Sequence, residues 1–501
     1  MKKVISVTLL TFILIVSIIL CLTKINSKNT MTYEEKKNDG IYLLNFLERN
    51  YPFFNVKKQA LGYDFLSNKE KLINKIANSK NDYEFYTNIY KTVCLLQNNH
   101  TKVLESASLP YSNNNKSPYA IDELKNKLKY WDNIKLNVFM FPNVTCKYIE
   151  GKYIVVNSLN PEIHIGDIII KVNGIPVNTY ALQKKDTTYL QYDFNRNVYY
   201  SNNLFMTMSS NKDILHIPIT IMDKNSKIKN SKITLKKLDK GMTYNTKNIN
   251  TKNISTKIIK KNDIAYLKVD SMIFTQEDID LIENFFNDIR NYKNLIIDIR
   301  ENCGGLQTYS DKLLSMINSN NIESTNYFCY RKSDFTDKYI ENFFPEFLGG
   351  KVLNNFKDIS SDEFNIYKTR TILPYSSNAF KGKVYLLTSS TVYSCSEKFA
   401  NQLKRAHLAT IIGTTTGGDG IGTGPWYFVL PNSKLCINIG VCMGLDSEGN
   451  INEKYHTQPD YYCEQSIYDY KQALENGITN IIGTKYDTIL NKCIEIINNN
   501  N

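Results

Sequence analysis

The sequence predicts an α/β core at the C-terminal end of the chain, preceded by a helical unit and a β-rich module. Three observations support this fold class. Apolar residues recur at helical spacing over residues 32–103, short β-branched runs dominate residues 132–238, and strand-like and helix-like segments alternate after Asp263. Such alternation is typical of a sheet covered by helices. A chain of 501 residues, 42% of them hydrophobic, is long enough for several such units.

The first element along the chain is an apolar segment, residues 4–23, which has no charged side chain and follows Lys2 and Lys3. At 1.5 Å per residue, this segment just crosses a bilayer core of ~30 Å. Because no small-residue cleavage site follows it, we expect residues 1–30 to hold an uncleaved membrane anchor. The basic N-terminus predicts a single-pass protein of the cell membrane whose remainder is extracytoplasmic, with secretion after signal cleavage as the alternative.

Two units and a linker are expected next. Residues 31–115 are predicted to be helical, and residues 116–240 to form a β-rich module with a turn at Asn173-Gly174. Residues 241–262 are rich in Lys, Asn and Thr and poor in large apolar groups, which is typical of a long loop or linker.

Residues 263–501 form the predicted α/β core. Thr275 and Asp278 have the spacing of a capping box, and we expect the helix that they begin to bury Ile279, Ile282, Phe286 and Ile289. Strands are expected at 264–269, 295–299, 384–388, 410–412 and 435–439, and helices from 275 and at 309–316, 396–405 and 488–497.

Composition excludes several classes of function. The ten cysteines form no C-x-x-C pair and are too sparse for a disulfide scaffold, so we expect no structural zinc site. No other metal site and no cofactor are expected. Cys436 and Cys442 could form a disulfide or remain free thiols. The net charge of +12 would suit nucleic acid, but no nucleic-acid-binding motif accompanies it, so no such partner is expected.

Two segments could carry chemistry. The strand at 295–299 runs into Gly304-Gly305, where the backbone can direct N–H groups at a developing oxyanion or simply form a tight turn. Ser394 stands where a helix is expected to begin, which suits either a nucleophile or, together with Glu397, a capping box. On local evidence alone, the turn and the cap are the simpler explanations.

These segments, in their order, resemble the C-terminal processing (tail-specific) peptidases, a family of serine proteases. The resemblance lies in residues 264–269, Gly304-Gly305, 393–397, 412–418, 430–433 and 453–460, and residues 165–177 resemble the signature of the PDZ domain that these proteases carry. It implies a crotonase/ClpP-like core, a PDZ-like domain for residues 116–240, and polypeptide substrates held possibly through their C-termini.

One departure bears on the mechanism. Many members use a serine–lysine dyad with the lysine in a Gly-Lys-Gly, but here that place has Gly418-Asp419-Gly420, and Lys398 is expected to face solvent. The sequence instead resembles the tricorn-type branch, which activates its serine with a histidine and a glutamate.

This resemblance implies Ser394 as nucleophile, His100 as base, Glu453 as the acid that orients the base, and N–H groups of Cys395 and of Gly304 or Gly305 as oxyanion donors. His100 lies in a segment like the branch's Asp-x-His-Thr, with Asn98 in place of the aspartate.

The other four histidines are weaker candidates. His456 is the main rival because it shares a loop with Glu453, whereas His164 and His216 lie in the β-rich module and His407 follows Ser394 by a whole helix. The sequence therefore predicts a membrane-anchored serine endopeptidase that acts through an acyl-enzyme. The alternative is a catalytically silent peptide-binding protein on the same fold.

Overall fold

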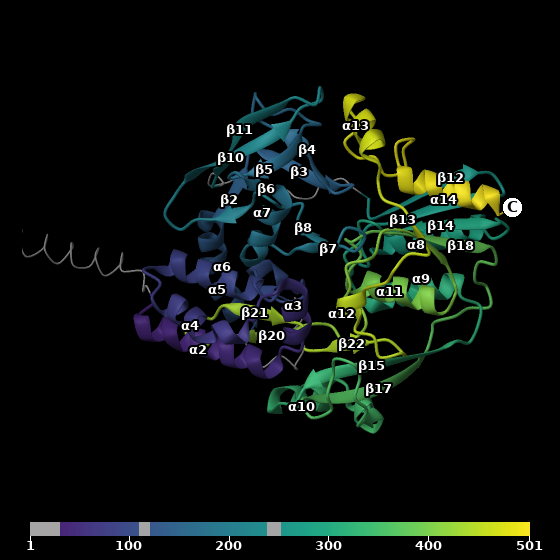
Figure 1. Ribbon diagram of the computed structural model, residues 1–501. Coiled ribbons are helices and arrows are strands. Elements are labelled where there is room, and N and C mark those ends of the chain that lie inside the picture. The colour runs from purple at the N-terminus through teal and green to yellow at the C-terminus, as the bar shows by residue number, and fades with distance from the viewer. Residues whose placement is uncertain (1–30, 110–120, 238–251, 501) are drawn as a thin grey trace, which may run out of the picture.

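The structure is a computed structural model that describes residues 31–109, 121–237 and 252–500. It contains a helical unit, a β-rich module and an α/β core with two sheets (Figure 1). In the described part of the chain, no helix is long and apolar enough to cross a membrane. The expected anchor, residues 4–23, lies outside the described residues.

The predicted helical N-terminal unit is confirmed. Its members are α2 (Tyr33–Asn50), α3 (Phe54–Leu61), α4 (Lys69–Ala77), α5 (Asp82–Cys94) and α6 (Ile121–Val138). α6 was expected in the β-rich module, but its Trp131 stacks on Tyr86 and lies beside Phe85 in the core of the helical unit. The helical unit therefore extends beyond the expected boundary at residue 115, because aromatic burial fixes α6 against α5.

The β-rich module is built on an antiparallel sheet with the order β3-β4-β5-β10-β11-β2-β9. Asn173 and Gly174 both have positive φ, as a tight turn between β5 and the short strand β6 requires. The strands are β2 (Phe139–Pro142), β3 (Val144–Ile149), β4 (Lys152–Ser158), β5 (Ile168–Val172), β6 (Ile175–Pro176), β9 (Thr207–Met208), β10 (Ile214–Met222) and β11 (Ile228–Lys236), and α7 (Val177–Gln183) packs beside them.

A hairpin of β7 (Gln191–Asp193) and β8 (Val198–Tyr200) joins this module to the α/β core. Arg196, in its turn, binds Asp193 within the hairpin and Glu464 of the core through two hydrogen bonds. A bidentate guanidinium–carboxylate pair fixes orientation as well as distance, so the hairpin holds the module in a defined position on the core.

The centre of the C-terminal core is a six-stranded sheet. Its strands, in spatial order, are β12 (Ile254–Lys260), β13 (Ile264–Val269), β14 (Asn294–Asp298), β18 (Lys383–Thr388), β19 (Thr410–Gly413) and β23 (Tyr461–Tyr462). All neighbours are parallel except β12 and β13. The helices are α8 (Gln276–Asp288), α9 (Gln307–Ile317), α11 (Cys395–Arg405), α13 (Ile467–Glu475) and α14 (Thr488–Asn499).

Both faces of this sheet are covered, as its continuous apolar strands predict. α8, α9 and α11 pack on one face and α14 on the other (Figure 1). The Thr275–Asp278 capping box is present. Of the predicted stripe, Ile282 and Ile289 are buried, while Ile279 and Phe286 are only partly buried.

The linker expected at 241–262 needs correction for its described part. Residues 254–260 form β12, which pairs with β13 through a turn at residues 261–263. The strand was missed because it lies at the sheet edge, where Ile254 is its only buried residue and the usual apolar alternation is weak.

A second sheet, with the order β16-β17-β15-β22, was not predicted. Its strands are β15 (Glu323–Arg331), β16 (Lys351–Val352), β17 (Phe364–Ile372) and β22 (Met443–Leu445), with α10 (Asp334–Phe343) beside them. Cys329 and Ile366 of this sheet share one hydrophobic core with Leu43 and Leu47 of α2. The N-terminal unit is therefore packed directly against the C-terminal half of the chain.

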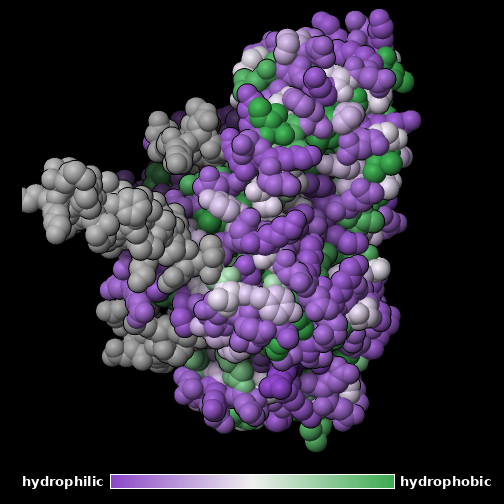
Figure 2. Space-filling model, turned by 90° about the vertical axis from the view of Figure 1, so that its left-hand side faces the viewer, coloured by the Kyte–Doolittle hydropathy of each residue, from purple (hydrophilic) through white to green (hydrophobic). Residues whose placement is uncertain are grey.

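A short strand completes this connection. β1 (Lys102–Val103) pairs antiparallel with β21 (Cys436–Ile439), which also pairs with β20 (Trp426–Val429). The segment that contains His100 is thus held against residues more than 300 positions later in the chain. The side of the molecule seen in Figure 2 is largely hydrophilic, and hydrophobic residues reach that surface only in small groups.

Candidate active site

His100 lies between the end of α5 and β1, in a segment fixed by backbone contacts. Its carbonyl oxygen accepts a hydrogen bond from Asn438 Nδ2 at 2.8 Å, and Thr101 Oγ1 accepts one from the Gly440 amide at 3.1 Å. Both partners belong to β21 or follow it directly. This pairing, rather than sequence proximity, carries the imidazole to the C-terminal core.

Ser394 occupies a sharp turn between β18 and α11. Its backbone has φ 57° and ψ −125°, a conformation that side chains rarely adopt, and its hydroxyl makes no capping hydrogen bond to the helix. Glu397, the other half of the possible capping box, is fully buried and points elsewhere. Backbone strain of about 1–3 kcal/mol is typical of functional positions, and here it leaves the hydroxyl free.

The serine and the imidazole are in direct contact. His100 Nε2 lies 2.8 Å from Ser394 Oγ, and His100 Nδ1 lies 2.8 Å from Asp419 Oδ2. Burial alone would raise the pKa of Asp419, but hydrogen bonds from His100 and Asn98 and the charge of Lys57 hold that pKa below the usual value. An ionised carboxylate only accepts hydrogen bonds, so Nδ1 carries the proton and Nε2 is free to accept the serine proton.

Asp419 therefore occupies the place that the sequence assigned to Glu453. The loop of Asp419 is tied to the nucleophile segment, since Tyr393 and Gly418 form a parallel bridge and the Tyr393 hydroxyl donates to Asp419 Oδ2 at 3.2 Å. In the sequence, residue 419 is a departure from the lysine pattern, and nothing local marks its carboxylate as the partner of an imidazole. The signal that another acid is needed is Asn98, which stands where the resembling branch has an aspartate.

Asn98 connects the two carboxylates. Its Nδ2 donates to Asp419 Oδ2 at 2.8 Å and lies 3.3 Å from Glu453 Oε1, while its Oδ1 accepts from the His100 amide at 3.1 Å. Glu453 also forms an ion pair with Lys57 of α3. Burial raises the pKa of Glu453 to about 7, with Lys57 acting against this and Asp419 adding to it. Glu453 thus belongs to the site, but it reaches His100 only through Asn98.

The rival base, His456, is directed away from this contact. Its Nδ1 lies 2.6 Å from the Thr416 carbonyl oxygen, and burial lowers the pKa of His456 to about 4. A Cβ on Gly418 would approach the His456 ring to 2.8 Å, so glycine is required where the two meet. His456 therefore packs neutral beneath the loop of Asp419. His164 and His216 remain on the β-rich module, as expected, and His407 lies just beyond the end of α11.

The glycine pair separates into two roles. The Gly304 amide already donates to Asn302 Oδ1 at 2.9 Å, and a Cβ on Gly304 would lie 2.9 Å from Ser394 Cβ. Gly305 and Cys395 instead line the cavity beside Ser394. Of the two glycines named from the sequence, Gly305 is therefore the one placed to donate with Cys395, and Gly304 provides the close approach of the loop.

Asn302 fixes the geometry between these groups. Its Oδ1 accepts from both the Gly304 amide and Ser396 Oγ, and its Nδ2 donates to the Val269 carbonyl oxygen at 3.1 Å. The side chain is fully buried. One amide thus joins the end of β13, the glycine loop and the first turn of α11.

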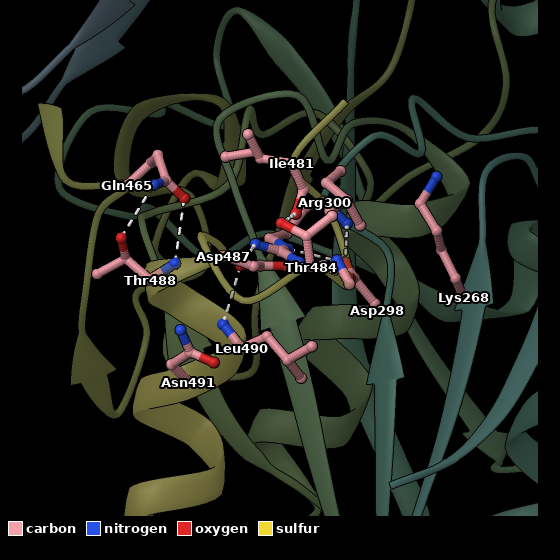
Figure 3. A network of polar contacts seen from close by, with 12 residues as sticks. Lys268, Asp298, Arg300, Gln465, Ile481, Thr484, Asp487, Thr488, Leu490 and Asn491 are labelled. Atoms are coloured by element: carbon pink, nitrogen blue, oxygen red, sulfur yellow. Dashed lines mark hydrogen bonds and ion pairs between the residues drawn. The ribbon is translucent and has the colours of Figure 1, made fainter. Parts of the chain in front are cut away.

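A buried ionic network supports the same loop from behind. Arg300 binds Asp298 at the end of β14 and Asp487, and Tyr266 donates to Asp298 Oδ2 at 2.7 Å. Figure 3 shows the guanidinium of Arg300 between the two aspartates. Asp487 also caps α14 by accepting from the Leu490 amide at 3.0 Å. The C-terminal helix is in this way tied to the loop that leads to Gly305.

Lys398 differs from its predicted position. Instead of facing solvent, it is half-buried and lines the cavity beside Ser394. Burial lowers the pKa of Lys398, while Asp311 of α9 acts in the opposite direction. The first turn of α11 faces α9 and the glycine loop, so position 398 lies on the inner side of the helix.

Glu397 makes the stability of the fold depend on pH. Burial raises its pKa from 4.5 to about 7, and its Oε2 has no hydrogen-bond partner among the described residues. Between these values the folded chain keeps a proton that the unfolded chain has lost, so stability falls as pH rises from about 4.5 to about 7. Glu397→Gln should remove this component, worth up to roughly 3 kcal/mol.

Denaturant unfolding of both proteins between pH 4.5 and pH 8 measures the effect. The free energy of unfolding of Glu397→Gln relative to the parent should rise with pH over this window. Parallel stability profiles for the two proteins would contradict the assignment.

Residues 263–463 match peptidase family S41. The chain carries an S41 peptidase domain. This C-terminal part of the chain is accordingly the domain of a serine-type peptidase. No curated protein sequence matches the chain.

Solved structures resemble most of the chain. A structure of mature CPAF complexed with lactacystin aligns at 14% identity and a TM-score of 0.61, covering 93% of this chain and 99% of that chain. A second structure of mature CPAF gives 13% identity, a TM-score of 0.61 and coverage of 93% and 98%. The photosystem II D1 C-terminal processing protease aligns over 91% of this chain and 99% of that chain, at 14% identity and a TM-score of 0.42. At these identities, the alignments with CPAF show a shared fold.

The S41 domain contains only part of the site. Ser394, Asp419, Glu453 and Gly305 lie within the matched residues, whereas His100 comes from the N-terminal helical unit, outside them. Asn98 and Lys57 also lie outside the S41 domain. The S41 domain therefore supplies the candidate nucleophile and acid, and the helical unit supplies the candidate base.

Proposed function

We propose that the protein is an endopeptidase in which Ser394, His100 and Asp419 form the catalytic triad. The observation that carries this proposal is the continuous chain of contacts, 2.8 Å from Ser394 Oγ to His100 Nε2 and 2.8 Å from His100 Nδ1 to Asp419. These distances are within the range required for general-base transfer of a proton.

The cycle follows from the positions of the groups. His100 takes the proton of Ser394 as the alkoxide attacks the peptide carbonyl, and the imidazolium is stabilised by Asp419. The Cys395 and Gly305 amides bind the oxyanion. His100 then protonates the leaving amine, and water hydrolyses the acyl-enzyme with His100 again as base. Glu453, Asn98 and Lys57 hold Asp419 and the His100 segment in place.

Two further parts of the proposal concern the substrate and its location. The β-rich module is proposed to act as a PDZ-like domain that adds a substrate strand to its edge and binds the terminal carboxylate. Residues 4–23 are proposed to anchor the chain in the cell membrane with the catalytic part outside the cytoplasm. Both proposals rest on sequence resemblance and on the apolar run.

Labelling with a fluorophosphonate probe tests the nucleophile. The full chain should be labelled covalently, and Ser394→Ala should lose the label, because the probe requires an activated serine. Ser396→Ala is a matched control two residues away and should retain labelling above the Ser394→Ala background. A labelled Ser394→Ala variant would overturn the assignment, and an unlabelled, folded parent would favour a silent peptide-binding protein.

A further inference from the structure

One wall of the cavity beside Ser394 carries a lysine, Lys398, whose charge the triad does not use. The cavity measures about 170 Å³ and is lined by Ser394, Gly305, Gln307 and Lys398 among others. Lys398 lies one helical turn beyond the nucleophile on α11, and Gln307 begins α9 on the facing side. A substrate bound to the oxyanion donors at Gly305 and Cys395 therefore passes next to Lys398.

The backbone amide of Lys398 donates to the Ser394 carbonyl oxygen, but its side-chain ammonium makes no hydrogen bond or ion pair within 4.0 Å to another residue of the described part of the chain. Neighbouring lysines differ in this respect. Lys404, farther along α11, pairs with Asp460, and Lys57 pairs with Glu453. Asp311 acts on Lys398 only through its charge. A half-buried ammonium without a close partner loses hydration that no protein group replaces.

The other charged groups at the cavity are already paired with each other or with neighbouring side chains. Asp419 lines the cavity, but its Oδ2 accepts hydrogen bonds from His100, Asn98 and Tyr393. His100 is committed to Asp419 and Ser394. Lys398 is thus the cation of this cavity that is left to bind an incoming group.

We propose that Lys398 binds a carboxylate of the substrate beside the scissile bond and so sets the substrate preference of the peptidase. The carboxylate can belong to an acidic side chain or to a nearby C-terminus, which have the same chemistry toward an ammonium. This proposal rests on the proposed function of Ser394. A charge-assisted hydrogen bond in a partly desolvated site contributes both affinity and discrimination.

Peptide cleavage by the full chain tests the proposal. In a quenched fluorescent peptide, each residue flanking the cleaved bond is replaced in turn by Glu, Gln or Lys. At one position, Glu should raise kcat/KM about tenfold or more over Gln. Lys398→Gln should abolish that preference by lowering kcat/KM for the Glu peptide to the value for the Gln peptide, and Lys398→Glu should favour the Lys peptide instead.

Two variants and one peptide pair sharpen the result. Lys404→Gln, on the same helix but paired with Asp460, should keep the preference, and Asp311→Asn should increase it because a competing negative charge is removed. If the carboxylate is a C-terminus, amidation of a peptide cleaved near its end should lower kcat/KM for the parent but not for Lys398→Gln.

The outcomes separate this proposal from the triad. A parent that cleaves neutral peptides without any preference for a carboxylate, or a preference that survives Lys398→Gln, would overturn the role of Lys398 and leave the triad intact. A folded parent that neither cleaves peptides nor reacts with the serine probe would overturn both.

Discussion

Asp419→Asn is expected to lower kcat by about 10⁴-fold, because asparagine would present an amide where His100 needs an ionised acceptor. The variant keeps the size of the side chain and its contact with Tyr393. It removes the charge that stabilises the imidazolium and the preference for the tautomer with a proton on Nδ1. Steady-state cleavage of a peptide substrate measures the loss, and KM should change much less than kcat.

Glu453→Gln is the matched control for that experiment. Glu453 reaches His100 only through Asn98, so we expect a loss in kcat smaller than that of Asp419→Asn by about 10²-fold or more. A greater loss in Glu453→Gln than in Asp419→Asn would return the role of the acid to Glu453, as the sequence resemblance implied.

His100→Ala is expected to have an effect of similar size, with kcat reduced by about 10⁴- to 10⁶-fold. Among the described residues, His100 is the one side chain within hydrogen-bonding distance of Ser394 Oγ, so the variant has no base in its place. Serine-probe labelling should also slow strongly, since the hydroxyl is no longer activated.

His456→Gln controls for the loss of a partly buried imidazole near the site. Its ring contacts Thr416 and Gly418 rather than Ser394, so kcat should stay within about tenfold of the parent. Circular dichroism of both variants establishes that each is folded. Parent-like activity of His100→Ala together with inactivity of folded His456→Gln would transfer the role of base to His456.

The parallel sheet could be predicted from the sequence because its strands are apolar on both faces. Residues such as Leu295, Ile296 and Ile297 leave few other possibilities. β15 and β17 were missed for the opposite reason. The first four residues of β15 are polar, as are four of the last five of β17, and residues such as Cys329 and Ile366 are buried in a core that the N-terminal helices share. Burial of that kind depends on contacts between segments far apart in the chain, which local patterns do not contain.

The candidate site, too, could be predicted in part from local motifs, and the rest of it depends on tertiary contacts. The histidine, the serine and the glycine loop could be named from motifs, whereas the acid could not, because two departures from the family pattern compensate for each other. An aspartate at position 98 would place a third carboxylate next to Asp419 and Glu453, where like charges repel. Asn98 instead donates to both. Only the tertiary arrangement shows that residues 98 and 419 face each other.

The pairing of β1 with β21 also determines when the site can exist during synthesis. Ser394 follows His100 by 294 residues, and the strand that holds the His100 segment ends at Ile439. At ordinary rates of translation, this interval lasts on the order of tens of seconds. Throughout that time the growing chain contains the imidazole without the strand that positions it. A nascent chain therefore has no assembled triad, and it cannot cleave itself or its neighbours before the C-terminal half has folded.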